Sequence, residues 1–548
     1  MRRSRTLAAV VGGGLAATAA LTAIGVGAGT AAEPLSGLTL HGVPANPKVP
    51  GTWYPNVLSP ELAEVAVAHG STRLENGTKE IPYYGYLGDG PLLPLLPGSN
   101  AEATKTEPDK NTYLVLDGQT GADPGASYGR HFLYQGHEGG TGYITRVNLD
   151  ANEAHRVTLL ASTDVNGKAL PTFDGSTYDP FAKKLLFTAE HGNSDEGGVW
   201  QATLDVPSKV RDISGALGRG GYEAIQNDSA GNLWIVEDIG GAYGKRFPNA
   251  KQPNSFVYRF VPEQVGDLTR GRLEALQVIS QRTHKPITFH ANAADADIKS
   301  PDVKDLHTYG LSFTTRWVTV HDTATAGFKA FDANLAAKAA RATPFKRPEN
   351  GQFRPGSDFR EFYFDATGDT NLDTEAGAQY GGFGAVFKLV QDDPGANTGR
   401  LSMFFRGDPA HTGFDNVAFF GRTQLVFVED AGDTLHTQRN ALDSAYLFDT
   451  RTDYSNQSKQ PLRILAEGRD PAATIDSALG DADTPDFQND GDNEITGIHV
   501  SSGDPTVNGI LGAQIPRPFV TGAGWRAFYT AQHGENVTWE IIKNRFGG

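Results

Sequence analysis

Carboxylates recur along this sequence where short apolar strands are expected to end. Glu190 follows one such run, and acidic pairs close two others, at 237–238 and 429–430. A second set of acids lies shortly before strands of this kind, at Glu223, Glu349 and Asp415. Carboxylates crowded into one place repel one another unless they are protonated or bound to cations. Hard oxygen ligands in this number suit Ca²⁺ best, with Mg²⁺ or Fe³⁺ as alternatives.

The strands that must position these acids come in similar pairs. A run such as 184–191 is followed by a turn containing glycine and a second strand at 198–204, and 424–430 is followed by 444–449 in the same way. Aromatic and β-branched residues separated by Gly, Asn and Asp are typical of antiparallel hairpins. Repeated units of this kind predict an all-β fold, a β-propeller of about five to six blades, because radial repetition protects the strand edges.

A propeller explains why the acids recur at one end of the strands. Its inner strands line a central channel, so acids at equivalent positions of different blades would converge at one mouth. The alternative architecture is a row of β-sandwiches, in which each acidic pair would only cap its own turn. We expect convergence, and hence a metal site.

The domain organisation follows from the spacing of the repeats. Residues 33–548 are predicted to form a single propeller domain, interrupted between Glu237 and Asp365 by a partly helical insertion around 265–345. Within it, the Ala-rich stretch 332–343 predicts a short helix. Four oxygen-bearing side chains further on, Asp365, Asp369, Asn371 and Asp373, alternate as in a calcium-binding loop. The complete EF-hand pattern is absent, so a structural calcium site and a plain turn both stay open.

Residues 1–32 have the features of a signal peptide. Three arginines within the first five residues precede an uncharged stretch, and Thr30, Ala31 and Ala32 provide small residues for cleavage. The Arg2 and Arg3 pair loosely resembles a twin-arginine signal, with the general secretory route as the alternative. A membrane anchor is a further alternative for this stretch. We expect a secreted, extracytoplasmic protein with no membrane span after cleavage.

Composition excludes several classes of function. The 548 residues include no cysteine, which rules out disulfides, thiolate metal sites and a cysteine nucleophile. A formal charge of -16 disfavours nucleic-acid binding and favours cation binding. A Gly-x-Ser-x-Gly match at 125–129 lies in a loop before a strand, whereas a nucleophile elbow needs a strand before it and a helix after it. We expect a monomer.

Six short motifs, in order along residues 134–533, resemble those of the PhoX-type alkaline phosphatases, a family of secreted calcium- and iron-dependent propellers. The motifs are Thr188-Ala-Glu-His191, Gly221-Tyr-Glu223, Arg347-Pro-Glu-Asn350, Phe414-Asp-Asn-Val417 with Val428-Glu-Asp430, Asp492-Asn-Glu-Ile-Thr-Gly497, and Ala531-Gln-His533.

The resemblance implies a role for several of these residues. By it, Glu190, Glu223 and Glu349 are metal ligands, with Asp492 and Glu494 as further candidates. It implies that Arg347 binds the phosphate of a small phosphorylated substrate, and that Arg347 and Glu349 are both catalytic-site residues. An arginine suits this task because its planar fork donates two hydrogen bonds to phosphate oxygens.

One departure from the family affects the choice of metal. Ala189 stands where the family has an iron-binding cysteine. A ferric site therefore cannot be carried over unchanged, which leaves Ca²⁺ alone, Fe³⁺ or another metal held by oxygen ligands, or lost hydrolysis. The predicted function is that of a secreted metal-dependent phosphatase. The alternatives are a non-catalytic calcium-binding propeller and a calcium-dependent hydrolase of other chemistry, such as a lactonase.

Overall fold

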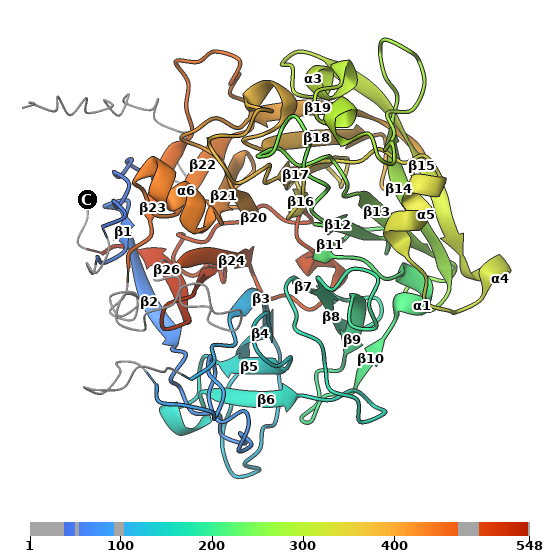
Figure 1. Cartoon of the computed structure of the whole chain (residues 1–548). Coiled ribbons are helices and arrows are strands. Elements are labelled where there is room, and N and C mark those ends of the chain that lie inside the picture. The colour runs from blue at the N-terminus through green and yellow to red at the C-terminus, as the bar shows by residue number, and fades with distance from the viewer. Residues whose placement is uncertain (1–37, 50–53, 93–102, 470–492, 546–548) are drawn as a thin grey trace, which may run out of the picture.

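The chain forms six β-sheet blades arranged around a central axis (Figure 1). This computed structural model describes residues 38–49, 54–92, 103–469 and 493–545. The expected signal peptide at 1–32 lies outside the described residues. The strands nearest the axis, one from each blade in order, are β3 (Pro108–Val115), β7 (Ser176–Asp179), β11 (Tyr222–Asn227), β16 (Gly351–Phe353), β20 (Phe414–Phe419) and β24 (Glu494–Ser501).

Each blade is an antiparallel meander that runs outward from its inner strand. Blade 1 continues with β4 (His131–His137), β5 (Ile144–Asn148) and β6 (Val157–Ala161). Blade 2 continues with β8 (Lys184–Ala189), β9 (Gly198–Ala202) and β10 (Val210–Asp212). Blade 3 continues with β12 (Leu233–Glu237), β13 (Val257–Pro262) and β14 (Gly271–Val278). Blade 4 continues with β17 (Glu361–Ala366), β18 (Ala385–Gln391) and β19 (Thr398–Arg406). Blade 5 continues with β21 (Gln424–Glu429), β22 (Ser444–Asp449) and β23 (Leu462–Ala466). Blade 6 continues with β25 (Arg526–Gln532) and β26 (Val537–Lys543).

Two strands from the start of the chain close the ring. β2 (Leu62–Ala68) pairs with β26 and becomes the fourth strand of blade 6. β1 (Val57–Leu58) pairs with β23 at the outer edge of blade 5. The outermost strands of blades 5 and 6 thus come from the N-terminal part of the chain. The ring is therefore closed by hydrogen bonds between strands rather than by chain connectivity.

The predicted insertion lies between blades 3 and 4. Its long strand β15 (Ser312–Asp322) pairs with both β14 and β19 and so joins the two blades into one nine-stranded sheet. β14, which lies within the expected bounds of 265–345, pairs with β13 and belongs to blade 3. The helix expected at 332–343 is present as α5 (Ala333–Ala339), capped by the Asp332 carboxylate, which accepts a hydrogen bond from Leu335 N at 2.8 Å.

The remaining helices are short and lie outside the blades. They are α1 (Ser214–Leu217), α2 (Ala294–Ile298), α3 (Pro301–Leu306), α4 (Thr323–Ala326) and α6 (Gly432–Arg439), with 3₁₀ turns η1 (Glu153–His155), η2 (Ala378–Tyr380) and η4 (Val507–Gly509). No helix within the described ranges is long and apolar enough to cross a membrane.

Apolar cores fill the wedges between neighbouring blades. In the largest, the Trp234 ring contacts Trp317 and Phe353, each at 5.0 Å between centroids, which packs blade 3 against β15 and blade 4. Aromatic pairs in edge-to-face geometry stabilise a core beyond the area that they bury. This face-to-face packing around a ring confirms the all-β propeller, with six blades, and excludes the row of sandwiches.

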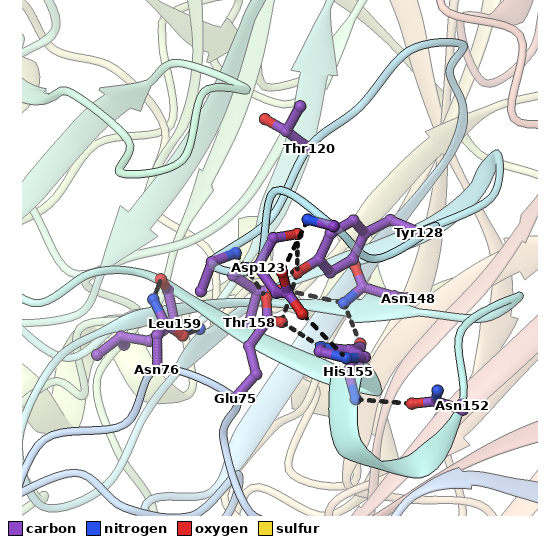
Figure 2. A network of polar contacts seen from close by, with 12 residues as sticks. Glu75, Asn76, Thr120, Asp123, Tyr128, Asn148, Asn152, His155, Thr158 and Leu159 are labelled. Carbon is purple, nitrogen blue, oxygen red and sulfur yellow. Dashed lines mark hydrogen bonds and ion pairs between the residues drawn. The ribbon is translucent and has the colours of Figure 1, made fainter.

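A polar network fastens the N-terminal segment to the outer face of blade 1 (Figure 2). Asn76 exchanges two hydrogen bonds with the backbone of Leu159, and Glu75 accepts from Tyr128 Oη at 2.7 Å and contacts His155 Nδ1 at 2.9 Å. Tyr128 belongs to the loop that carries the Gly-x-Ser-x-Gly match, and this loop leads into β4 with no helix after it. The network therefore has a structural role, because it holds the N-terminal segment against blade 1. The Gly-x-Ser-x-Gly match is not a nucleophile elbow.

Candidate metal centre

One acid lies at the same end of every inner strand. It is the first or second residue of the strand or lies two residues before it: Asp109, Asp174, Glu223, Glu349, Asp415 and Glu494. In four blades, an acid also comes directly after the second strand: Glu138, Glu190, Asp238 and Asp430. Since neighbouring strands are antiparallel, the start of the first strand and the end of the second meet at one face of the propeller.

Seven of these carboxylates form three overlapping groups. In each group, one oxygen from every member lies within 4.8 Å of the others. The groups are Asp109 with Glu138 and Asp174; Asp174 with Glu190 and Glu223; and Glu223 with Glu349 and Asp415. We call these the first, second and third triads. The structure thus brings together Glu190, Glu223 and Glu349, as the sequence predicted, with Glu223 shared by two triads.

The triads are electrostatically unfavourable without counterions. Burial raises the pKa of Glu223 well above its usual value, and repulsion by Asp174 and Glu190 raises it further. The pKa of Glu349 is raised in the same way, by burial and by Asp238, although Arg347 opposes the shift. Ion ligands lie ~2.3–2.6 Å from Ca²⁺, so oxygens within 4.8 Å of one another can share one ion. The donors present therefore fit a hard divalent cation.

Arg347 supplies positive charge beside the third triad. Its Nε donates to Asp238 Oδ2 at 2.7 Å, and its Nη2 lies 3.5 Å from Glu349 Oε1. The backbone of Arg347 has a φ of 56° and its carbonyl accepts a hydrogen bond from Thr367 N at 2.8 Å, so its position is fixed by blade 4. Its side chain remains 20% exposed.

Lys110 is a second cation close to the triads. It follows Asp109 on β3, is 1% exposed, and its Nζ donates to Asn350 Oδ1 at 2.9 Å. Burial lowers the pKa of its ammonium to about 8, against the opposing effect of Asp415 and Asp109.

Glu494 and Asp492 do not join the triads. Glu494 begins β24 at the same mouth, but its carboxylate lies 3.2 Å from His533 Nε2 and it belongs to none of the triads of described residues. Asp492 lies outside the described residues. A role for either as a metal ligand stays a prediction.

Within each acidic pair, only one residue faces the mouth. Glu237 points to the outside of its blade, where it accepts hydrogen bonds from Tyr258 Oη and Asn334 Nδ2, both at 3.0 Å. Glu429 likewise bonds Arg439 of α6 at 2.7 Å. Successive side chains of a strand point to opposite faces, so two adjacent acids cannot both converge. The second member of each pair, Asp238 or Asp430, is the one near Arg347.

The alternating acids at 365–373 do not form a calcium loop. Asp365 lies on β17, where it accepts from Asn350 N at 2.7 Å. The Asp369 carboxylate instead receives Lys346 Nζ at 2.7 Å, Thr374 Oγ1 at 2.6 Å and Lys251 N at 2.9 Å. An ammonium group already occupies the place that a cation would take.

We therefore expect Asp369→Ala to destabilise the protein without changing its metal content. Both partners of the Lys346 ion pair are buried, and removing one leaves the other charge uncompensated, which costs about 3–5 kcal/mol. Denaturant unfolding and metal analysis of the variant test this together. A loss of bound calcium in a folded variant would reinstate the loop as a metal site.

Sequence reasoning missed three of the triad positions. Asp109, Glu138 and Asp174 were not singled out. All three lie in the first triad. An alignment of the repeats with one another would have found them, since each occupies the same place in its blade as Glu223 or Glu190.

The position of the family's cysteine offers no ligand. Ala189 is fully buried at the end of β8, in an apolar cluster with Phe187 and Trp200. His191, beyond it, contacts Thr172 Oγ1 at 2.7 Å on the surface. These residues do not fit an iron held by a thiolate.

Fold and site together define a six-bladed propeller whose mouth carries carboxylate groups that could hold metal ions. The sequence model of the family described as alkaline phosphatase PhoX matches residues 247–440, which include Arg347, Glu349 and Asp415. The chain is thus similar to this family over residues 247–440, and it contains no cysteine.

The comparison with one solved structure supports the fold. The chain is similar to Pseudomonas fluorescens PhoX in complex with vanadate, a transition state analogue, with a TM-score of 0.53 and 12% identity over 93% of this chain and 98% of that one. It is more distantly similar to XC5397, a gluconolactonase from Xanthomonas campestris, with a TM-score of 0.36 and 11% identity over 92% of this chain and 99% of that one. No curated protein matches the sequence.

Proposed function

We propose that this protein is a secreted, calcium-dependent phosphatase that hydrolyses small phosphate esters at the mouth of the propeller. The observation that carries the proposal is the third triad with Arg347 beside it. Glu223, Glu349 and Asp415 offer carboxylate oxygens, and Arg347 lies beside Glu349 with its side chain 20% exposed. A cation site adjacent to an arginine suits a substrate that is an oxyanion.

The bound ions, Arg347 and Asp238 would each have a separate role. When bound, divalent ions would neutralise the carboxylates, polarise the phosphoryl group and lower the pKa of a bound water. Arg347 would orient the phosphate through its free N–H groups, and Asp238 fixes the guanidinium in place by accepting from Nε. Asp238 thus serves as a positioning residue for Arg347.

The family and the structural relative support this assignment. The PhoX relative binds vanadate, described as a transition state analogue, and the family match covers the part of this chain that holds Arg347. The replacement of the family's cysteine by Ala189 is what favours the alternative, a non-catalytic propeller that uses calcium structurally.

The test is release of phosphate from an aryl phosphate by the purified protein, in excess calcium and in excess chelator, with a lactone substrate as the comparison. We expect calcium-dependent phosphate release and no lactone hydrolysis. A protein that is inert with calcium, magnesium and iron alike would support the non-catalytic alternative instead.

Chelation should destabilise the protein, and more so as the pH rises. A carboxyl group whose pKa is higher in the folded chain than in the unfolded chain binds more protons when folded, so the free energy of unfolding falls with increasing pH. Burial and Asp443 raise the pKa of Asp430 to about 6, and those of Glu223 and Glu349 are raised as well. In chelator, the melting temperature should therefore fall above about pH 6, whereas calcium should largely prevent the fall. A gap between the two conditions that does not widen from pH 6 to pH 9 would contradict this.

A further inference from the structure

Lys110 reaches across the axis of the propeller. It lies on β3 of blade 1, and its hydrogen-bond partner Asn350 directly precedes β16 of blade 4. These two strands face each other across the centre of the ring (Figure 1). The Lys110 side chain therefore lies between blades 1 and 4 near the axis and is closed off from solvent at 1% exposure.

The surroundings of the ammonium are those of a cation site. Its main electrostatic partners are four carboxylates: Asp415, Asp109, Asp365 and Asp174. Three of these are members of the first or third triad. The fourth, Asp365, is fully buried, and its Oδ2 receives no hydrogen bond from the residues that the structure describes. Such an oxygen needs a positive charge nearby, and Lys110 is the cation that faces it.

A relay of amides connects Lys110 to the third triad. Asn350 accepts from Lys110 and donates through Nδ2 to Asn416 Oδ1 at 3.0 Å. Asn416 in turn donates to both oxygens of Asp415, at 2.8 and 2.9 Å. Because Lys110 bonds an amide rather than a carboxylate, the acids keep oxygens available for other cations.

We propose that the Lys110 ammonium occupies the place of one further divalent ion on the propeller axis and thereby limits how many metal ions the triads bind. The inference rests on the proposed metal site. A single positive charge here compensates Asp109, Asp365 and Asp415 in part, without requiring an ion at a position closed to solvent. Lys110 is thus a positioning residue of the site rather than a catalytic one.

The test is the number of divalent ions per chain, measured by elemental analysis after dialysis against calcium, for the wild type, Lys110→Met and Lys110→Arg. Lys110→Met should bind one more ion per chain than the wild type, because the freed carboxylates can share it. Lys110→Arg keeps the charge and should bind the wild-type number. Lys388→Met removes a lysine that pairs with Glu361 away from the mouth and is the matched control, with no expected change.

Each outcome bears on the proposal. A folded Lys110→Met variant that binds the same number of ions or fewer would overturn it. Lys110→Met that folds only in calcium would support it, since an ion then replaces the ammonium. If it stays unfolded in millimolar calcium while Lys110→Arg folds, the ion cannot take this place and the inference is wrong. A wild type without bound divalent ions would contradict both this inference and the proposed function, whereas a metal-loaded wild type would leave the latter intact.

Discussion

Glu223→Gln should lower calcium content and catalysis together, with a loss of phosphatase kcat/KM of about 10²-fold or more. Glu223 belongs to both the second and the third triad, so no other single change removes a ligand from two groups at once except at Asp174. The amide keeps the shape of the side chain but removes the negative charge. The measurements are calcium content per chain and hydrolysis of an aryl phosphate.

The same variant should change stability in opposite directions with and without metal. In chelator above about pH 6, removing one of the crowded carboxylates should raise the melting temperature, because the pKa of Glu223 is raised by burial and by its acidic neighbours. In calcium, the variant should melt below the wild type, since it loses an ion ligand.

Glu237→Gln is the matched control for Glu223. Glu237 is also a fully buried acid of blade 3, but it bonds Tyr258 and Asn334 outside the mouth. This variant should retain calcium content and activity. A Glu223→Gln protein that keeps both properties as the control does would show that the triads hold no functional ion.

Arg347→Ala should lower kcat/KM for an aryl phosphate by about 10²-fold or more, by analogy with the removal of one transition-state donor. Arg347→Lys keeps the charge but loses the planar fork that bonds Asp238 and would bond the phosphate, so it too should be impaired. The two variants should also differ in stability. Because Asp238 and Glu349 both lose their counterion, Arg347→Ala should melt below the wild type, whereas Arg347→Lys should melt close to it.

Arg354→Lys is the control for the arginine variants. Arg354 forms a two-pronged ion pair with Glu361, with both hydrogen bonds at 2.8 Å, between the end of β16 and the start of β17, away from the mouth. The same substitution there should leave phosphatase activity unchanged. An Arg347→Ala protein with wild-type kcat/KM would mean that another residue binds the phosphate.

The sequence revealed the blades because each one repeats the same local signals. Alternating aromatic and β-branched strands with glycine turns are visible within single hairpins, such as β8 with β9. The ring closure was not predictable in this way, because β2 and β26 come from opposite ends of the chain. The same holds for β15, whose pairing with β19 bridges two blades across the insertion.

The candidate site was predictable only where an acid stood next to a recognisable strand. Glu190, Glu223 and Glu349 met this condition, and the structure brings them together. Asp174 precedes the short strand β7, and Asp109 lies in the polar start of β3, so neither stood out. For the acidic pairs at 237–238 and 429–430, the sequence did not show which residue belongs to the site. Which of two adjacent acids faces the axis depends on the orientation of the strand, which only the tertiary structure fixes.

The most direct test of the account is an anomalous-scattering map from crystals of the protein grown with calcium. The account predicts calcium peaks ~2.3–2.6 Å from carboxylate oxygens of the triads, one of them bound by Glu223 and close to Arg347. A map in which calcium appears only at surface carboxylates, with the three triads free of ions at millimolar calcium, would contradict it.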